Sequence, residues 1–402
     1  MHVVIVGASV AGIRTAQALR AREFDGPITV IGDEPRQPYD KPPLSKQMLD
    51  PATDGEPIAL LPVEAIDELH LDVHLGMPAT ALDTTGKTLA LGDGTDISYD
   101  ILVIACGVTP RTLPGVAEFA NVHTVRTADD AHALRHALLP GSRAVAIGAG
   151  FIGAEFASAA TTRGASVTLV EAQETPLSAQ LGPDVGGRLA ELHTANGVTL
   201  LTGQQVSGFD GHDRVTGVRL ADGSGIPADL VVIGIGAVPA VDWLESSALT
   251  LDNGIVCDSS LRAIGVRDVY AAGDVARWHN PVYDELTRIE HWTNANEHAD
   301  TIAAGIVGAA APRPALPYVW SDQYGKRIQI IGRPALGSPV IVEGDAVAGN
   351  LIAGYADDSG VLVGALVLDN PRLLLKFRKA INAGTHYQKF AESVLTPDPA
   401  TT

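Results

Sequence analysis

The sequence contains one pattern twice: a short apolar run, a glycine turn, a helical segment, a second apolar run and an acidic residue. In the first copy, residues 3–6 and 28–31 are the apolar runs and residues 7–12 form the turn. Runs rich in valine and isoleucine are typical of buried parallel strands. Such a unit places a pyrophosphate on the N-terminus of the helix and a ribose on the carboxylate after the second strand. We therefore expect an α/β fold with a dinucleotide-binding unit at its start.

The small residues of the first turn have physical reasons. Gly7 lets the chain turn sharply out of the strand, position 9 lies closest to the phosphates, and Gly12 lets the helix pack against the strand. Ser9 departs from the G-x-G-x-x-G pattern, but serine is small and its hydroxyl can donate to a phosphate oxygen. Asp33 and Glu34 follow the second strand. The alternative is an ordinary βαβ crossover that binds no ligand.

The second copy is complete. Residues 144–147 and 167–170 are its strands, and the full G-x-G-x-x-G pattern follows the first of them with Gly148, Gly150 and Gly153. Every part of the dinucleotide fingerprint is present. Two such units predict two dinucleotides, or two halves of an enzyme that passes something between them.

The acidic residue of the second copy predicts which nucleotide binds. Glu171 stands 23 residues after Gly148, and Ala172 and Gln173 follow it. A carboxylate accepts hydrogen bonds from both ribose hydroxyls of NAD and repels a 2′-phosphate, and no arginine follows closely to offset that repulsion. We expect this site to prefer NADH over NADPH.

Composition argues against several classes of function. The formal net charge of −19 disfavours nucleic acid or an anionic membrane as a partner. Cys106 and Cys257 are the only cysteines, which argues against a disulfide framework, a thiol redox pair and a cysteine-ligated iron–sulfur cluster, and no metal site is predicted. There is no apolar run of about 18 residues, and a first strand at residue 3 leaves no room for a signal peptide. We expect a cytoplasmic protein.

Two further segments carry candidate site residues. After a proline-containing loop, Ser45 can cap a helix that starts at Lys46, and a lysine held there can point its charge into a cofactor site. The alternative is a solvated surface lysine. A later strand ends in Gly273 and Asp274. A carboxylate at that edge can accept hydrogen bonds from a polyol chain, or it can cap a helix.

The pattern changes after a proline-rich linker at residues 312–317. Residues 327–331, 340–342, 350–353 and 361–368 predict successive strands of an antiparallel sheet, and Asn370 and Pro371 can cap and start a helix that Gly384 ends. Residues 313–402 carry nine basic and eight acidic residues, a net +1, so the first 312 residues carry −20. The predicted helix bears four basic residues, Arg372, Lys376, Arg378 and Lys379. They form either a solvated face or a docking patch for an acidic protein.

Several stretches are specific in combination: residues 42–46 (Pro-Pro-Leu-Ser-Lys), the second glycine turn with Glu155, and residues 270–274, 290–295 and 320–325. With them the chain resembles, over its whole length, the FAD-dependent ferredoxin reductases of the putidaredoxin reductase and biphenyl-dioxygenase reductase type. The resemblance implies two interleaved Rossmann-like domains and a C-terminal α+β interface domain, in a glutathione-reductase-like architecture. We expect an FAD-binding domain in residues 1–112 and 240–316, an NAD-binding domain in 113–239 and the C-terminal domain in 317–402.

The resemblance also implies roles for single residues. For FAD, Gly7, Ser9, Ala11 and Gly12 with Asp33 would hold the pyrophosphate and the adenosine ribose, and Ala79 would contact adenine. Asp274, next to Gly273, would hold the ribityl chain, and Arg126 stands at a position that contacts FAD. Trp292 and Trp320 would lie near the flavin ring. For NADH, they are Gly148, Gly150, Ile152, Gly153, Glu155, Glu171 and Gly236. Lys46 and Glu155 line the flavin and the nicotinamide and are the predicted catalytic residues. Cys106 stands where the family usually has threonine or alanine; neither it nor Ser9 is expected to remove FAD.

The implied activity is a ferredoxin–NAD(+) reductase. A hydride passes from NADH to FAD, and single electrons then pass to an acidic [2Fe–2S] ferredoxin that serves a haem-thiolate monooxygenase or a Rieske dioxygenase. The lack of a cysteine pair favours direct transfer from flavin to partner. The alternatives are a rubredoxin reductase, an NADH oxidase, and a redox-sensing interaction protein resembling apoptosis-inducing factor, against which the acidic first 312 residues count.

Overall fold

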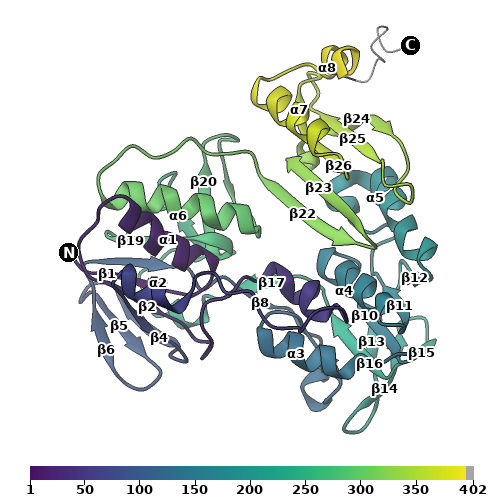
Figure 1. The fold of residues 1–402 in the computed structure, drawn as a ribbon, viewed down its shortest axis with the longest axis horizontal. Helices are drawn as coiled ribbons and strands as arrows, with labels where there is room; N and C mark the ends of the chain where they lie inside the picture. The colour runs from purple at the N-terminus through teal and green to yellow at the C-terminus, as the bar shows by residue number, and fades with distance from the viewer. Residues whose placement is uncertain (395–402) are drawn as a thin grey trace. The chain divides into compact units, whose positions relative to one another are not determined.

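Two parallel sheets, one in each of two units, carry the elements around the glycine turns (Figure 1). The computed structural model describes residues 1–394. Its contacts divide the chain into a first unit of residues 1–43, 57–109 and 237–315, and a second unit of residues 44–56, 110–236 and 316 onward. The assignment of FAD-binding, NAD-binding and C-terminal domains stays a prediction.

The first unit is built on a five-stranded parallel sheet of order β19-β7-β1-β2-β3. Its strands are β1 (Val3–Val6), β2 (Ile28–Ile31), β3 (Leu71–His74), β7 (Ile101–Ile104) and β19 (Val269–Ala271). Every residue of β1, β2, β7 and β19 is buried, as expected for strands of a parallel sheet that is covered on both faces. Helices α1 (Val10–Ala21) and α6 (Trp292–Ile306) pack side by side on this sheet.

Smaller elements complete the first unit. Strands β5 (Thr88–Leu91) and β6 (Asp96–Ser98) form a hairpin, to which β4 (Ala79–Asp83) adds a third strand. Helix α2 precedes β3, and two more small sheets are formed by the remaining strands. The bounds are α2 (Val63–Glu68), β8 (Val108–Pro110) with β17 (Ala237–Pro239), and β18 (Ile255–Cys257) with β20 (Ala276–Asn280) and β21 (Glu285–Thr287).

The second unit repeats the parallel architecture with the order β12-β11-β10-β16-β9. Its strands are β9 (Val122–His123), β10 (Arg143–Ile147), β11 (Ser166–Val170), β12 (Thr199–Leu201) and β16 (Leu230–Ile233). The helices are α3 (Ala128–Ala137), α4 (Phe151–Thr162) and α5 (Ser178–Ala195). A three-stranded antiparallel sheet joins them, with β13 (Val206–Gly211), β14 (Val215–Leu220) and β15 (Gly225–Pro227).

The second unit also holds an antiparallel sheet of order β22-β23-β26-β25-β24. The four predicted strands are confirmed as β23 (Lys326–Gly332), β24 (Ser338–Glu343), β25 (Ile352–Ala356) and β26 (Leu362–Leu368), and β22 (Tyr318–Gln323) adds a fifth. Helices α7 (Pro371–Asn382) and α8 (Tyr387–Val394) follow. As predicted, Asn370 caps α7, its side chain accepting from the Leu373 N–H at 3.0 Å.

Alternation along these strands buries both faces of the antiparallel sheet. Ile328 and Leu366 pack with Leu181 and other residues of α5, whereas Ile331 and Ala365 belong to the core that includes α7. Successive residues of a strand point to opposite faces, so one pair of strands supplies two cores. The sheet is thereby fixed to α5 of the same unit.

Residues 44–56, here named the strap, belong to the second unit. Arg135 of α3 donates to the carbonyl oxygens of Met48, Asp50 and Thr53 at 2.9, 2.7 and 2.6 Å, and Arg163 donates to that of Leu49 at 3.1 Å. One 3₁₀ turn, Pro42–Ser45, leads into the strap, and a second, Gln47–Leu49, lies within it. The predicted helix starting at Lys46 with Ser45 as its cap is therefore wrong, because side-chain hydrogen bonds from outside the segment hold its carbonyls in place of a helical ladder.

None of the helices among residues 1–394 combines the length and the apolar composition that a membrane span requires.

A buried histidine lies where α5 meets the antiparallel sheet. His193 is 3% exposed, and its Nδ1 lies 2.8 Å from the Tyr324 hydroxyl. Burial lowers the pKa of His193 from its usual value near 6.5 to about 4, because the charged imidazolium loses its hydration. The folded protein therefore holds this ring neutral at pH values where the unfolded chain protonates it.

The variant His193→Gln should be less sensitive to acid. Protonation favours the unfolded chain, so His193 lowers the free energy of unfolding as the pH falls from near 6.5 toward 4, by about 2 kcal/mol between pH 7 and pH 5. Glutamine can still pair with Tyr324 but does not titrate. Urea unfolding at pH 7 and pH 5 should therefore show that the variant lacks this loss of unfolding free energy. The exposed His212→Gln is the control. Equal acid sensitivity of His193→Gln and the unsubstituted protein would contradict the assignment.

Candidate functional site

The first glycine turn is closed by contacts that only glycine permits. Gly7 has φ +116°, and a Cβ there would lie 2.3 Å from the Ala105 carbonyl oxygen. A Cβ on Gly12 would lie 1.9 Å from the Gly7 carbonyl oxygen. Ser9 is the N-cap residue of α1, and within residues 1–394 its side chain makes no capping hydrogen bond. The first turn of the helix contains no acidic residue. The first N–H groups of α1 therefore suit an anionic group.

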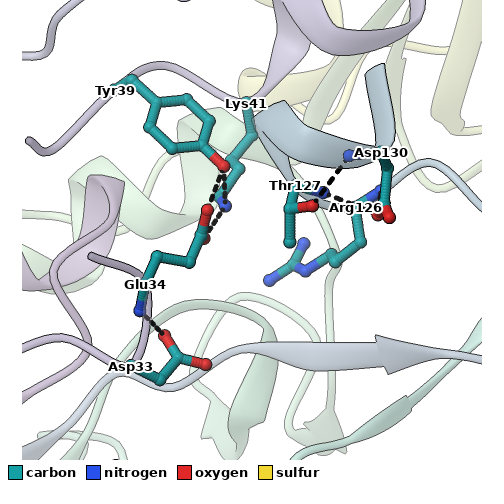
Figure 2. Close-up of polar contacts among 7 residues, drawn as sticks. All are labelled: Asp33, Glu34, Tyr39, Lys41, Arg126, Thr127 and Asp130. Carbon is teal, nitrogen blue, oxygen red and sulfur yellow. Dashed lines mark hydrogen bonds and ion pairs between the residues drawn. The ribbon is translucent and has the colours of Figure 1, made fainter. Parts of the chain in front are cut away.

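The carboxyl end of β2 presents two acidic residues that differ in their surroundings. Glu34 is held by the Tyr39 hydroxyl and by Lys41, whose Nζ lies 2.5 Å from Glu34 Oε1 and 2.9 Å from the Tyr39 hydroxyl (Figure 2). Asp33 is exposed and accepts from the Glu34 N–H at 3.0 Å. An exposed carboxylate at this strand end suits a ribose hydroxyl pair. The sequence did not predict the Tyr39–Lys41 clamp on Glu34.

A second group of predicted residues in the first unit lies beside the turn. A Cβ placed on Gly273, which has φ +71°, would lie 3.1 Å from the Ala11 Cβ, so the two predicted positions are neighbours. The Gly273 N–H donates to His298 Nδ1 at 3.1 Å. Asp274 lies within the 3₁₀ turn Gly273–Val275, whose N-cap is Ala272. Trp292 begins α6 and donates from Nε1 to Asp40 Oδ1 at 2.7 Å.

The second glycine turn has the same geometry as the first. A Cβ on Gly148 would lie 2.4 Å from the Gly234 carbonyl oxygen, and one on Gly153 would lie 1.9 Å from the Gly148 carbonyl oxygen. Gly150 is the N-cap of α4, and within the described residues nothing lies within 4 Å of a Cβ placed there. This open space in front of an uncapped helix fits the pyrophosphate of a dinucleotide.

Glu171 closes the second turn from the next strand. Its Oε2 accepts from the Ala149 N–H at 2.8 Å and its Oε1 from the Gln173 N–H at 2.9 Å. These bonds orient the carboxylate at the carboxyl end of β11. Two other predicted positions belong to the same unit: Ile152, which is 40% exposed on α4, and Gly236, which has φ +92°.

A buried ion pair joins the two predicted catalytic residues. Lys46 Nζ lies 2.8 Å from Glu155 Oε2, with the two side chains 17% and 3% exposed. The Ser45 hydroxyl donates to the same oxygen at 2.5 Å, and the Ser321 hydroxyl donates to Oε1 at 2.6 Å. A carboxylate removed from water needs such donors on both oxygens. The alternative of a solvated surface lysine is excluded for Lys46.

Sequence reasoning named Lys46 and Glu155 but missed Ser321 and Gln323, whose amide Nε2 donates to the Ser321 hydroxyl at 3.0 Å. Ser321 lies in the Trp-Ser-Asp stretch that contributed to the resemblance, so that stretch was the available signal. The Ser321–Glu155 contact joins residues 166 positions apart. No local pattern predicts such a contact.

The candidate residues divide between the units. The first unit holds Gly7, Ser9, Ala11, Gly12, Asp33, Ala79, Gly273, Asp274 and Trp292, and the second holds Lys46, Arg126, Gly148, Gly150, Ile152, Gly153, Glu155, Glu171, Gly236 and Trp320. The Arg126 and Thr127 N–H groups both donate to Asp130 at 3.0 Å, which fixes the start of α3 (Figure 2). Trp320 stacks on Tyr318 with ring centroids 6.0 Å apart.

Comparison with known proteins agrees with this geometry. Residues 1–299 match the family described as pyridine nucleotide-disulphide oxidoreductase, and residues 318–398 match the family described as reductase C-terminal. Rhodocoxin reductase of Rhodococcus erythropolis is 35% identical over all of this chain and 92% of its own length. The benzene 1,2-dioxygenase system ferredoxin–NAD(+) reductase subunit of Pseudomonas putida is 38% identical, over 82% of this chain and 80% of its own.

Solved structures give the same result. The covalent putidaredoxin reductase–putidaredoxin complex contains a chain that superposes with a TM-score of 0.93 at 32% identity, covering 98% of this chain and 96% of that one. Fdr9 superposes with a TM-score of 0.87 at 40% identity, covering 96% and 95%. The predicted fold class and the predicted resemblance are confirmed, and the family implies a flavin and a nicotinamide cofactor. The chain therefore belongs to the pyridine nucleotide-disulphide oxidoreductase family and, within it, to the ferredoxin reductases of the putidaredoxin reductase type.

Proposed function

We propose that this enzyme passes electrons from NADH through FAD to a [2Fe–2S] ferredoxin, with the cytoplasm as its expected location. The observation that carries the proposal is the pair of glycine turns, each with an uncapped helix behind it and a carboxylate beside it. FAD, when bound, accepts a hydride from NADH and releases electrons one at a time. Rhodocoxin reductase and the benzene dioxygenase reductase subunit support a ferredoxin-type acceptor by their names.

We assign FAD to the turn of the first unit. Gly7, Ser9, Ala11 and Gly12 would admit the pyrophosphate to the α1 N–H groups, and Asp33 would bind the adenosine ribose. Gly273 lies beside Ala11, and we assign Gly273 and the adjacent Asp274 to the ribityl chain. The remaining assignments, Ala79, Arg126, Trp292 and Trp320, rest on the family resemblance.

We assign NADH to the turn of the second unit, with Gly148, Gly150, Ile152, Gly153 and Gly236 around the nucleotide and Glu171 on its ribose. Lys46 and Glu155 would lie by the nicotinamide and the flavin. The ammonium of Lys46 would favour negative charge on a neighbouring cofactor ring. Its ion pair with Glu155 and the strap contacts of Arg135 hold that charge in one place.

The reaction is tested by stopped-flow reduction of cytochrome c with NADH, with and without a panel of [2Fe–2S] ferredoxins. We expect a yellow protein and a large stimulation by one ferredoxin, because the small acceptor carries the electrons onward. Rapid oxygen consumption without any ferredoxin would favour an NADH oxidase, and a response to rubredoxin alone would favour a rubredoxin reductase. A tight, slowly reoxidised NADH complex would favour a redox sensor. Material that stays colourless when supplied with FAD would contradict the proposal.

The nucleotide preference is tested at Glu171. Its carboxylate should repel the 2′-phosphate of NADPH, so kcat/KM for NADH should exceed that for NADPH by at least about tenfold. Glu171→Gln keeps a hydrogen-bond acceptor and loses the charge, and it should narrow the ratio by about the same factor. Glu174→Gln, at an exposed position three residues on, removes an equal charge and should leave the ratio unchanged. An enzyme that uses NADPH as well as NADH would refute the assignment.

We propose that the acidic ferredoxin docks on the α7 patch, defined as Arg372, Lys376, Arg378 and Lys379. All four residues are exposed, while Leu373, Leu374 and Phe377 of the same helix are buried. The Arg378 guanidinium lies 5.8 Å from the centre of the Tyr318 ring, and Tyr318 stacks on Trp320. The patch is therefore contiguous with the tryptophan that we assign to the flavin side of this domain.

Charge reversal on α7 should weaken ferredoxin binding. The double variant Lys376→Glu and Lys379→Glu should raise the KM for ferredoxin about tenfold or more at low salt, and the effect should shrink as salt screens the charges. NADH-driven reduction of ferricyanide should be unchanged. Lys389→Glu on α8, exposed in the same domain, is the matched control. A KM for ferredoxin that the α7 changes leave untouched would place docking elsewhere.

A further inference from the structure

Strand β22 of the antiparallel sheet reaches the buried carboxylate of α4. The Ser321 hydroxyl donates to Glu155 Oε1 at 2.6 Å, and Ser321 itself is fully buried. Gln323, 3% exposed, donates to the same hydroxyl at 3.0 Å. Because the Ser321 oxygen accepts from Gln323, its own hydrogen is directed at Glu155. Gln323, Ser321 and Glu155 thus form a short chain of hydrogen bonds from the sheet to the carboxylate.

The two oxygens of Glu155 are served from different segments. Oε2 contacts Lys46 and Ser45 of the strap, whereas Oε1 contacts Ser321 of β22. A carboxylate bound at one oxygen can rotate about its last bond, but one bound at both is fixed in its plane. A buried charge that loses a donor becomes uncompensated and tends to reorganise its partners.

We propose that Ser321 is a positioning residue that fixes Glu155, and through Glu155 holds the ammonium of Lys46 in place for reaction with NADH. The inference rests on the proposed function, in which Lys46 lies by the flavin and the nicotinamide. Ser321 touches neither cofactor in this assignment, so it acts through Glu155. The C-terminal sheet thereby contributes to the chemistry of the nucleotide site in addition to any partner binding.

The competing explanation is that Ser321 only attaches β22 to α4. The chain offers a matched control, because Ser158 of α4 makes another contact between the same two parts: its hydroxyl accepts from the Tyr324 N–H at 2.7 Å. Ser158→Ala removes this contact and leaves Glu155 untouched. An effect specific to Ser321 therefore separates positioning from attachment.

The first measurement follows Lys46 directly and does not depend on turnover. The holoenzyme is treated with formaldehyde and cyanoborohydride, and methylation of Lys46 is followed by mass spectrometry, with the exposed Lys379 as internal reference. Ser321→Ala should raise the rate of Lys46 methylation about tenfold, the factor expected when a charged group loses one hydrogen bond. Ser158→Ala should leave it within about twofold. Ser321→Thr and Ser321→Val, equal in shape and different only in the hydroxyl, repeat the comparison if Ser321→Ala folds poorly.

The second measurement is the limiting rate of flavin reduction at saturating NADH. Ser321→Ala and Ser321→Val should lower this rate about tenfold with little change in the KM for NADH, and Ser321→Thr should restore it. Equal methylation in the Thr and Val variants, an equal effect of Ser158→Ala, or faster methylation with an unchanged reduction rate would each overturn the proposal. If NADH fails to reduce even the unsubstituted protein, the proposed function falls, while the methylation data still report on the Ser321–Glu155–Lys46 linkage.

Discussion

The second unit depends on one buried carboxylate. Glu155 is 3% exposed and carries its charge among apolar neighbours of α4, a placement that water loss makes unfavourable unless donors surround it. The donors come from the strap and from β22, which lie far from α4 in sequence. Strap, helix and sheet must therefore all be assembled before the charge is compensated. A single electrostatic requirement thus couples the position of Lys46 to the docking of the antiparallel sheet.

The two glycine turns obey one steric constraint that the chain meets twice. In each, the last glycine of the turn approaches the carbonyl oxygen of the first so closely that any Cβ would collide with it. The close approach brings the helix N-terminus to the end of the strand, and the uncapped N–H groups then face the same opening. The two copies therefore resemble each other in backbone packing. Ser9 can replace glycine in the first copy because its backbone is extended, with φ −107° and ψ −163°, a conformation open to any residue.

Local sequence patterns predicted most of the fold, and the features that the sequence did not predict depend on contacts between distant residues. The parallel strands, the hairpin of β5 and β6, the antiparallel sheet and the Asn370 cap all follow from apolar periodicity and turn chemistry within a few residues. The strap was predicted wrongly, because Arg135 and Arg163 hold its carbonyls from helices more than 80 residues away in sequence. Lys46 was a candidate from its place after the proline-containing loop, and the resemblance gave Lys46 and Glu155 their roles. The pairing of the two residues, and the contact of Ser321 with Glu155, needed the tertiary structure.

We propose that the α7 patch is more than the polar side of an amphipathic helix. Because Leu373, Leu374 and Phe377 are buried, the other side of the helix is exposed in any case. The exposure of the four basic residues alone therefore does not indicate a function. The sign of the charge is informative, because α7 contains four basic residues and no acidic one. Arg372 and Lys376 stand four apart, and like charges at that spacing destabilise a helix by about 0.2–0.5 kcal/mol. Mixed charges serve solubility equally well, so the single sign of charge on this helix, in a chain of net charge −19, is the basis on which we propose an acidic partner.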